Sequence, residues 1–246
     1  MKKGRYLIKY TQKYIEGIFV EECKNRFLCM VEVDGTTEMC YVASSANLKN
    51  FLNLSGKTVL LSENKGKQTR TRYTLFAVKL RSQYALLNLN MINSFLDAGA
   101  VYLLGKQQIA QIAEREKRIT AEYKCDLFYG GNNPVVVEAK AVLSDCALVH
   151  FPSVQCYRNE KQLKALEQIL DSGLDVYYCL VVISPTIKDI ELRKNAAFLD
   201  ALSRCIRAGM TLRVVRLNIS SEKNVSLEND RMLENKVLSS IMESGD

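Results

Sequence analysis

The 246-residue chain contains a single histidine, and this scarcity narrows the kinds of enzyme it could be. The histidine, His150, lies near Cys146 and Cys156 in the sequence. Cysteine and serine hydrolases need a histidine base against the nucleophile, whereas a lone histidine more often has a structural role. The eight cysteines form no C-x-x-C pair, which argues against a zinc ribbon or a thioredoxin-type site. Chemistry based on histidine or cysteine is therefore disfavoured.

Long hydrophobic segments are also missing. No apolar run reaches the roughly 20 residues of a membrane span, and no uninterrupted apolar stretch follows the basic start Met1–Arg5, as a secretory signal would require. Apolar residues nevertheless make up 48% of the chain, which is enough for a core. Several cysteines lie in apolar stretches and suit a reducing compartment. We therefore expect a globular, cytoplasmic protein without a membrane partner.

The positive charge is concentrated in the first third of the chain. Residues 1–81 carry 15 Lys and Arg against 7 Asp and Glu, whereas the whole chain has a net charge of +7. A basic part joined to a nearly neutral part suggests a module that binds a polyanion, and nucleic acid is the first candidate. A basic surface that only aids solubility is the alternative.

Residues 1–84 have the pattern of a small β-barrel. Short apolar stretches at 18–20, 27–33, 58–61 and 73–78 follow one another closely, and Asp34-Gly35 is a strong hairpin signal between strands. Close-set strands of this kind fit an oligonucleotide-binding (OB) fold.

The densest basic stretch, residues 65–73, lies within this part of the chain. Its cations could follow a phosphate backbone, and Tyr73 or Phe76 could stack a base, although both aromatics also suit the barrel core. The expected nucleic-acid-binding cations here are Lys65, Lys67, Arg70 and Arg72.

Residues 85–219 alternate between helical and strand patterns. Helices are expected at 104–117, 160–171 and 189–208, and strands around Asp126 and Glu138 and at 174–183 and 212–219. This order predicts an α/β domain with a mixed sheet between helices. Residues 220–246 are polar and predict either a disordered tail or one weak helix docked on the body.

The chemistry concentrates in Pro134–Lys140 and in Asp126, which precedes another strand-like stretch. Because side chains alternate along a strand, Glu138 and Lys140 should lie on the same side. Asp126 and Glu138 could bind a hard divalent cation, and the lysine could orient water or offset phosphate charge. The same residues also suit the solvated face of an edge strand, so the spacing alone leaves both interpretations open.

The wider pattern resembles the PD-(D/E)xK nuclease superfamily, in which a helix, two strands carrying Asp and Glu-x-Lys, and a second helix follow one another. Within it, the chain resembles the sugar fermentation stimulation protein family (SfsA), whose members join an OB-like domain to a nuclease-like domain. The similarity covers most of residues 13–218. It is carried by Glu116, by Tyr123 to Leu127, by Glu138-Ala139-Lys140, by Leu87 to Asn93 and by Phe151 to Leu163.

The resemblance implies a catalytic core of Asp126, Glu138 and Lys140, with the two carboxylates binding Mg²⁺ or Mn²⁺. Glu116, on the expected helix, would be a further catalytic residue or ligand, and Glu114 is an equally plausible candidate for that place. Two cations that open the next helix, Arg158 and Lys161, would contact substrate phosphates.

The chain also departs from the family pattern near this core. Tyr123-Lys124 replaces Ser-Arg, and Ser153 and Tyr157 replace acidic residues. Because losses around a metal site can weaken metal binding, two functions stay open. One is a metal-dependent nuclease of DNA or RNA, with DNA as the first candidate partner. The other is a non-catalytic DNA-binding regulator of sugar metabolism with a vestigial site. The sequence does not fix the oligomeric state, and a homodimer is compatible with it.

Overall fold

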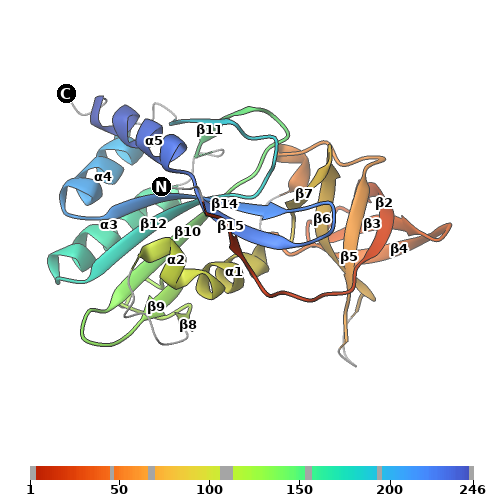
Figure 1. Cartoon of the computed structure of the whole chain (residues 1–246), viewed down its shortest axis with the longest axis horizontal. Helices are drawn as coiled ribbons and strands as arrows, with labels where there is room; N and C mark the ends of the chain where they lie inside the picture. Colours follow the sequence, from red (N-terminus) through yellow and green to blue (C-terminus); the bar gives the residue numbers. More distant parts are fainter. Residues whose placement is uncertain are drawn as a thin grey trace.

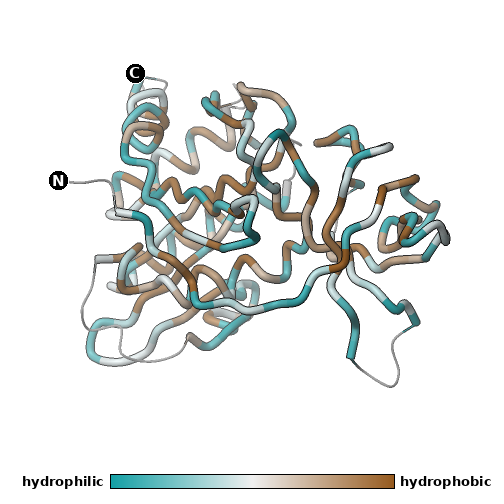
Figure 2. Tube along the Cα trace, turned by 45° about the vertical axis from the view of Figure 1, so that its right-hand side comes forward, coloured by the Kyte–Doolittle hydropathy of each residue, from teal (hydrophilic) through white to brown (hydrophobic). Residues whose placement is uncertain are grey.

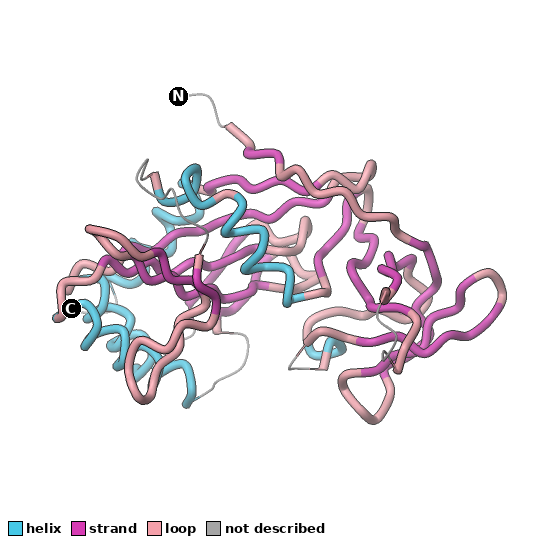
Figure 3. The backbone as a smooth tube through the Cα atoms, turned by 90° about the horizontal axis from the view of Figure 1, so that it is seen from below, coloured by secondary structure: helices cyan, strands magenta, loops and turns pink. Residues whose placement is uncertain are grey.

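One extended sheet runs through two lobes of the molecule (Figure 1). The computed structural model describes residues 4–44, 47–65, 70–105, 113–152, 157–192 and 196–243. The strands follow the order β4-β3-β2-β5-β6-β7-β14-β12-β10-β9-β8. Helices gather in the lobe that contains the C-terminus, whereas the other lobe consists mainly of strands (Figure 3).

The N-terminal lobe is the expected OB-like barrel. The barrel strands have the sheet order β4-β3-β2-β5-β6. The two end strands of this order also meet, because Cys40 of β4 pairs with Tyr73 of β6, and this pairing closes the sheet. The hairpin at Asp34-Gly35 is confirmed: both residues have positive φ, 49° and 77°, as a type I′ turn requires. The barrel strands are β2 (Ile15–Glu22), β3 (Leu28–Val33), β4 (Thr36–Tyr41), β5 (Thr58–Glu63) and β6 (Tyr73–Leu80).

The two lobes share their sheet and part of their core. Strand β7 (Gln83–Leu86) pairs with β6 on one side, and its Tyr84 pairs with Ile219 of β14 on the other. One hydrophobic cluster includes Phe76 from the barrel together with Phe95 and Val215 from the second lobe. The expected domain division at residue 84 falls inside this connecting strand.

The second lobe is the expected α/β domain. Its central strands β10 (Val135–Val142), β12 (Asp175–Val182) and β14 (Thr211–Ile219) are parallel, and β9 (Leu127–Tyr129) and β8 (Glu114–Arg115) continue the sheet in the antiparallel sense.

Helices cover both faces of this sheet because its buried strands are apolar on both sides. Along β12, Tyr178, Leu180 and Val182 face α3 (Tyr157–Asp171), α4 (Ala196–Arg207) and α5 (Arg231–Glu243). The intervening residues Tyr177, Cys179 and Val181 face α1 (Ile92–Ala98) and α2 (Ala100–Leu104). Hydrophobic segments accordingly run through the interior in Figure 2. None of the helices in the described ranges is long and apolar enough to cross a membrane.

Two helix predictions were wrong in their extent. Helix α2 ends at Leu104 because Gly105 adopts the left-handed conformation (φ 66°) that terminates helices. Residues 106–112 lie outside the described part, and Glu114–Arg115 is a strand. The predicted helix 189–208 begins only at Ala196, because Asp189–Leu192 forms β13, whose buried Ile190 pairs in parallel with Val149 of β11 (Leu148–Phe151).

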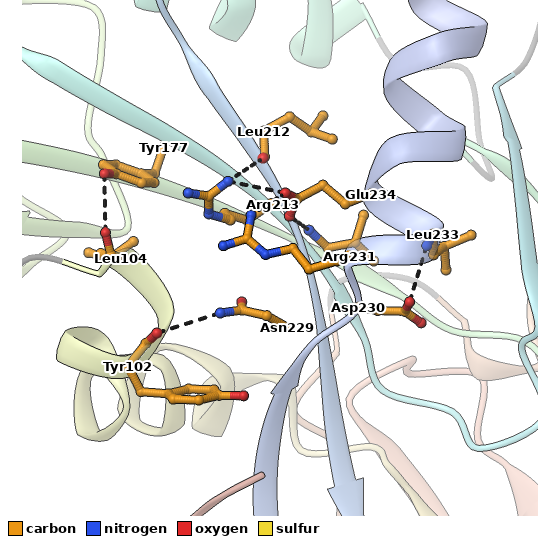
Figure 4. A network of polar contacts seen from close by, with 11 residues as sticks. Tyr102, Leu104, Tyr177, Leu212, Arg213, Asn229, Asp230, Arg231, Leu233 and Glu234 are labelled. Carbon is orange, nitrogen blue, oxygen red and sulfur yellow. Dashed lines mark hydrogen bonds and ion pairs between the residues drawn. The ribbon is translucent and has the colours of Figure 1, made fainter. Parts of the chain in front are cut away.

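The C-terminal segment is built into the domain. Strand β15 (Val225–Asn229) pairs with β14 and with β1 (Tyr6–Leu7), and α5 buries Leu233, Val237 and Ile241. Glu234 of α5 accepts bonds from Arg213 (3.1 Å), Arg231 (2.7 Å) and the N–H of Val214 (3.1 Å), as Figure 4 shows for the arginines. Of the two expectations for residues 220–246, a docked helix is therefore the one observed, together with a strand.

Candidate active site

A cleft of about 710 Å³ lies where the two lobes meet, and it contains most of the expected site. Both lobes contribute to its lining. The barrel side supplies Phe27, Tyr41, Ala43 and Ser44, and the α/β side supplies Leu89, Asn90, Ile92, Asn93, Arg115, Glu116, Asp126, Ala139, Lys140 and Ala141.

Glu138 and Lys140 lie on the same side of β10, as their spacing predicted. Lys140 Nζ is 2.6 Å from Glu138 Oε1. Strand β10 is flanked by β9 and β12, and Glu138 is only 2% exposed. The alternative of a solvated edge strand is therefore wrong. A glutamate this deeply buried needs a charge partner, and Lys140 provides it.

Asp126 is held against the same strand by the main chain. Strands β9 and β10 pair up to Leu127 and Val137, and Asp126 is the residue just before β9. Its Oδ2 accepts the N–H of Ala139 at 2.8 Å, and its Oδ1 accepts a longer bond from Asn93 at 3.4 Å. The Asp126 side chain thus takes the place of a strand partner and brings its carboxylate beside Glu138 and Lys140.

Asp126 has a perturbed pKa. Burial, and then the negative charge of Glu138, raise the pKa of Asp126 to about 6, against the opposing effects of Ala139 N–H, Lys140 and Asn93. Lys140 ion-pairs with Glu138, and its charge also acts on Asp126. Two carboxylates and one lysine leave an excess of negative charge in a partly buried place.

Two further side chains fix Glu138 and Lys140. The buried Tyr123 hydroxyl donates to Glu138 Oε2 at 2.6 Å, and burial raises the pKa of Tyr123 far above its ordinary value, so the hydroxyl keeps its proton. Lys140 also donates to Gln162 Oε1 on α3 at 2.8 Å. Sequence reasoning treated Tyr123 only as a departure from the family and gave Gln162 no role. Side-chain alternation along β10 predicts which residues of this strand share a side. It does not predict which residues of other elements contact them.

Glu116 lines the cleft, although not from a helix. It occupies the turn after β8 with φ 49°, and its N–H donates to the main-chain oxygen of Asp126 at 3.2 Å. The alternative, Glu114, pairs with Lys117 and is absent from the cleft lining described here. Glu116 is therefore the better placed of the two to act beside Asp126.

The donor set fits a hard divalent cation. In the described ranges, no three His, Cys, Asp or Glu side chains are clustered closely enough to form a complete metal site. Mg²⁺, however, is commonly held by one or two carboxylates with water in its remaining positions. After burial, the negative charge of Glu138 is the next cause of the raised pKa of Asp126, and a cation between the two carboxylates would offset that repulsion. Asp126 and Glu138, with Glu116 nearby, are the residues that would hold Mg²⁺ or Mn²⁺.

The expected nucleic-acid contacts fall in two other places. Arg158 and Lys161 line a groove of about 400 Å³ with Arg118 and Lys124, and Tyr123 and Gln162 separate this groove from Glu138 and Lys140.

The basic stretch of the barrel lies on the connection between β5 and β6. Lys65, Arg70 and Arg72 are exposed and are not among the described residues that line the cleft, and Lys67 lies outside the described ranges. Tyr73 and Phe76 are 3% and 1% exposed, so of the two interpretations of these aromatics the barrel core is confirmed and base stacking is wrong. Ser153, a family departure, also lies outside the described ranges.

Comparisons with known proteins agree with this architecture. The SfsA N-terminal OB domain matches residues 22–87, and the sugar fermentation stimulation protein RE domain matches residues 88–223. A sugar fermentation stimulation protein homolog of Desulfitobacterium hafniense (strain Y51) is 25% identical over 87% of this chain and 93% of the relative. The homolog of Saccharolobus solfataricus is 24% identical over 74% of this chain and 69% of the relative.

A solved structure has the same fold. The structure described as Pyrococcus furiosus SfsA in complex with Ca²⁺ superimposes with a TM-score of 0.78 and covers 91% of this chain and 97% of that chain, at 18% identity. The two family domains together span most of the 246 residues, in the order in which the barrel and the α/β domain occur. The chain therefore belongs to the sugar fermentation stimulation protein family, SfsA.

Proposed function

We propose that this protein is a divalent-metal-dependent nuclease that hydrolyses phosphodiester bonds, with DNA as the favoured substrate. The observation that carries the proposal is the excess negative charge of Asp126, at the wall of a cleft, and of the buried Glu138 beside it, with Lys140 as their shared cation. A fold alone does not define a function, but this arrangement has the chemistry that phosphodiester hydrolysis needs.

Each residue has a separate role in this proposal. A bound Mg²⁺ or Mn²⁺ would supply Lewis-acid activation of the phosphate and lower the pKa of a bound water. Asp126 and Glu138 bind the cation, and Ala139 N–H and Tyr123 OH hold their carboxylates in place. Lys140, oriented by Glu138 and Gln162, stabilises the negative charge that develops on the phosphate. Glu116 adds a carboxylate at the open side of the cleft.

The related structure supports this proposal through the cation in its description. Pyrococcus furiosus SfsA is described as a complex with Ca²⁺. Ca²⁺ and Mg²⁺ are both hard cations that prefer oxygen ligands. A carboxylate site that binds such a cation in this chain would therefore be consistent with a relative of the same fold.

A non-catalytic DNA-binding regulator is the second candidate, and one observation favours it. Both oxygens of Glu138 already accept bonds, from Lys140 and from Tyr123, and the side chain is 2% exposed. A glutamate that stays in this arrangement would coordinate a cation poorly, and the protein would then bind nucleic acid without cutting it.

A cleavage panel distinguishes the two candidates. Single- and double-stranded DNA and RNA are incubated with the protein in Mg²⁺, in Mn²⁺ and in EDTA. We expect metal-dependent cleavage that falls about 100-fold or more in Asp126→Ala and in Lys140→Ala. Glu191→Ala, which removes an exposed carboxylate of β13 in the same domain, should cleave like the wild type.

Equal cleavage by wild type, Asp126→Ala and Lys140→Ala would reject the proposed site. Binding that persists in EDTA, with no cleavage in either metal, would favour the regulator.

A further inference from the structure

The two walls of the cleft differ in chemistry. On the barrel side, Phe27 and Tyr41 line the cleft with 38% and 36% of their surface exposed. The backbone segments that carry the two rings are hydrogen-bonded to each other: the N–H of Val42, which follows Tyr41, donates to the carbonyl of Phe27 at 2.8 Å. Aromatic side chains that stay partly exposed in a cleft offer flat apolar faces to a ligand.

The α/β wall is charged and polar. Lys140 and Arg115 provide positive charge, Asp126 and Glu116 provide negative charge, and the amides of Asn90 and Asn93 provide hydrogen-bonding groups. Arg115 is fixed by a 2.9 Å bond to the hydroxyl of Ser94. A phosphate suits this wall once a divalent cation offsets the carboxylates, and a planar base suits the other wall.

We propose that the cleft takes a single DNA strand, with bases stacked on Phe27 and Tyr41 while an adjoining phosphate lies against Lys140. This inference rests on the proposed function and specifies the strand state of its substrate. Tyr73 and Phe76, the aromatics first considered for stacking, are buried in the barrel and cannot serve. The stacking surface is instead at the lobe interface, opposite the charged residues.

The aromatic wall favours an unpaired strand over a duplex. The cleft volume of about 710 Å³ is within the range of small-molecule pockets and accommodates a short piece of one strand. In a duplex the base faces are stacked inside the helix and are not available to Phe27 or Tyr41. Stacking on an aromatic side chain tolerates any base, so this contact would give little sequence preference.

A cation next to the aromatic wall extends the path of the strand. The guanidinium carbon of Arg26 lies 4.9 Å from the centre of the Phe27 ring. Arginine beside a stacking aromatic is a common arrangement in proteins that bind single strands, because it contributes both a cation–π contact and a phosphate contact. The barrel wall therefore offers a stacking surface with its own positive charge.

The test measures binding, independently of cleavage. A single-stranded DNA oligonucleotide carrying 2-aminopurine is titrated with the full-length protein in Ca²⁺, a hard cation that prefers oxygen ligands, and affinity is also followed by fluorescence anisotropy against a duplex of the same length. We expect quenching of the 2-aminopurine by stacking, and tighter binding of the single strand. Phe27→Ala and Tyr41→Ala should each reduce the quenching and weaken single-strand binding about tenfold, the loss typical of one stacked base.

Two variants serve as controls. Tyr41→Phe keeps the ring and should bind like the wild type. Met39→Ala truncates a 42% exposed side chain on the same face of β4, outside the cleft lining, and should also leave binding unchanged. Phe27 and Tyr41 are partly exposed, so their truncation should leave the melting temperature within a few degrees of the wild type.

The outcomes separate this inference from the proposed nuclease activity. Wild-type cleavage together with unchanged single-strand affinity and quenching in both alanine variants would overturn the inference and leave the activity standing. Loss of quenching in both variants of a protein that never cleaves would support the stacking surface and reject the activity. Tighter binding of the duplex than of the single strand, or no binding of either, would overturn the inference.

Discussion

Two buried glutamates of the α/β domain have different charge surroundings. Glu234 is 3% exposed and is bonded to Arg213, to Arg231 and to a main-chain N–H, so two cations balance its charge (Figure 4). Glu138 is 2% exposed but shares a single lysine with a second carboxylate, Asp126. In the barrel, the described buried polar side chains are Ser44, Thr71 and Thr74, which carry no charge.

The difference separates a structural ion cluster from a candidate reactive one. The Glu234 cluster fixes α5 on β14, and its single carboxylate faces two arginines, so no negative charge there lacks a cation. At the Glu138 site two carboxylates face one lysine, and burial, followed by the negative charge of Glu138, raises the pKa of Asp126. A buried charge imbalance of this kind costs stability and is typical of functional sites. The same comparison leads to three predictions of decreasing size.

The largest expected effect is on stability, at Glu234. Glu234→Gln leaves Arg213, whose side chain is 18% exposed, without its anion, and it should lower the free energy of unfolding by about 3 kcal/mol. Arg231→Ala is the matched control: this arginine is 60% exposed, and its loss should cost less than about 1 kcal/mol. Urea denaturation measures both. Equal losses in the two variants would contradict the assignment of the Glu234–Arg213 pair as the main clamp on α5.

Removing the charge of Asp126 should raise the free energy of unfolding, whereas removing the charge of Glu234 should lower it. In the metal-free protein the raised pKa means that folding is favoured while Asp126 is protonated, and this contribution disappears as the pH rises from about 4 to about 6. Asp126→Asn is isosteric and lacks the charge. It should therefore become more stable than the wild type as the pH passes 6, by on the order of 2 kcal/mol.

Denaturation of both proteins at pH 4 and pH 8 in EDTA measures this difference. A variant that is less stable than the wild type at pH 8 would show that Asp126 has a favourable charge environment without a cation. The difference in charge surroundings between Asp126 and Glu234 would then be absent.

The smallest effect is expected from the exposed cations outside both clusters. Replacing Lys65, Arg70 and Arg72 by alanine should weaken DNA binding and reduce the slope of log affinity against log salt by about 0.7 for each lost phosphate contact. Stability should hardly change, because exposed ion pairs such as Arg72–Glu63 contribute little. Lys236→Ala on α5 is a control cation that should leave the slope unchanged. An unchanged slope in the triple variant would place the electrostatic contact elsewhere.

Sequence patterns predicted the fold where local rules determine it. The Asp34-Gly35 turn, the apolar run of β12 and the i, i+2 placement of Glu138 and Lys140 follow from backbone geometry and side-chain alternation. The pattern at 104–117 misled because apolar residues at helical spacing continue past Gly105, which ends the helix. Asp189–Leu192 was mistaken for part of a helix. It forms a strand because it pairs with β11, which lies 41 positions earlier in the sequence, and a tertiary contact of this kind leaves no local pattern.

The candidate site could be predicted only in part, because some of its contacts are tertiary and leave no local pattern in the sequence. Asp126, Glu138 and Lys140 are visible as a motif, whereas the Tyr123 and Gln162 bonds depend on how a loop and α3 pack against β10. The position of the aromatic wall depends on the placement of the barrel against the α/β domain. The sequence directed attention to Tyr73 and Phe76, because a basic aromatic stretch gives a strong local signal even when its aromatics face the core.

We expect a divalent cation to offset the excess negative charge of Asp126 and Glu138. Crystals of the wild type and of Asp126→Asn, soaked in Mn²⁺ and measured for anomalous scattering, test this expectation most directly. We predict an anomalous peak within bonding distance of carboxylate oxygens of both Asp126 and Glu138 in the wild type, and its loss in the variant. A wild-type crystal without Mn²⁺ at these oxygens, or an equal peak in the variant, would contradict the account.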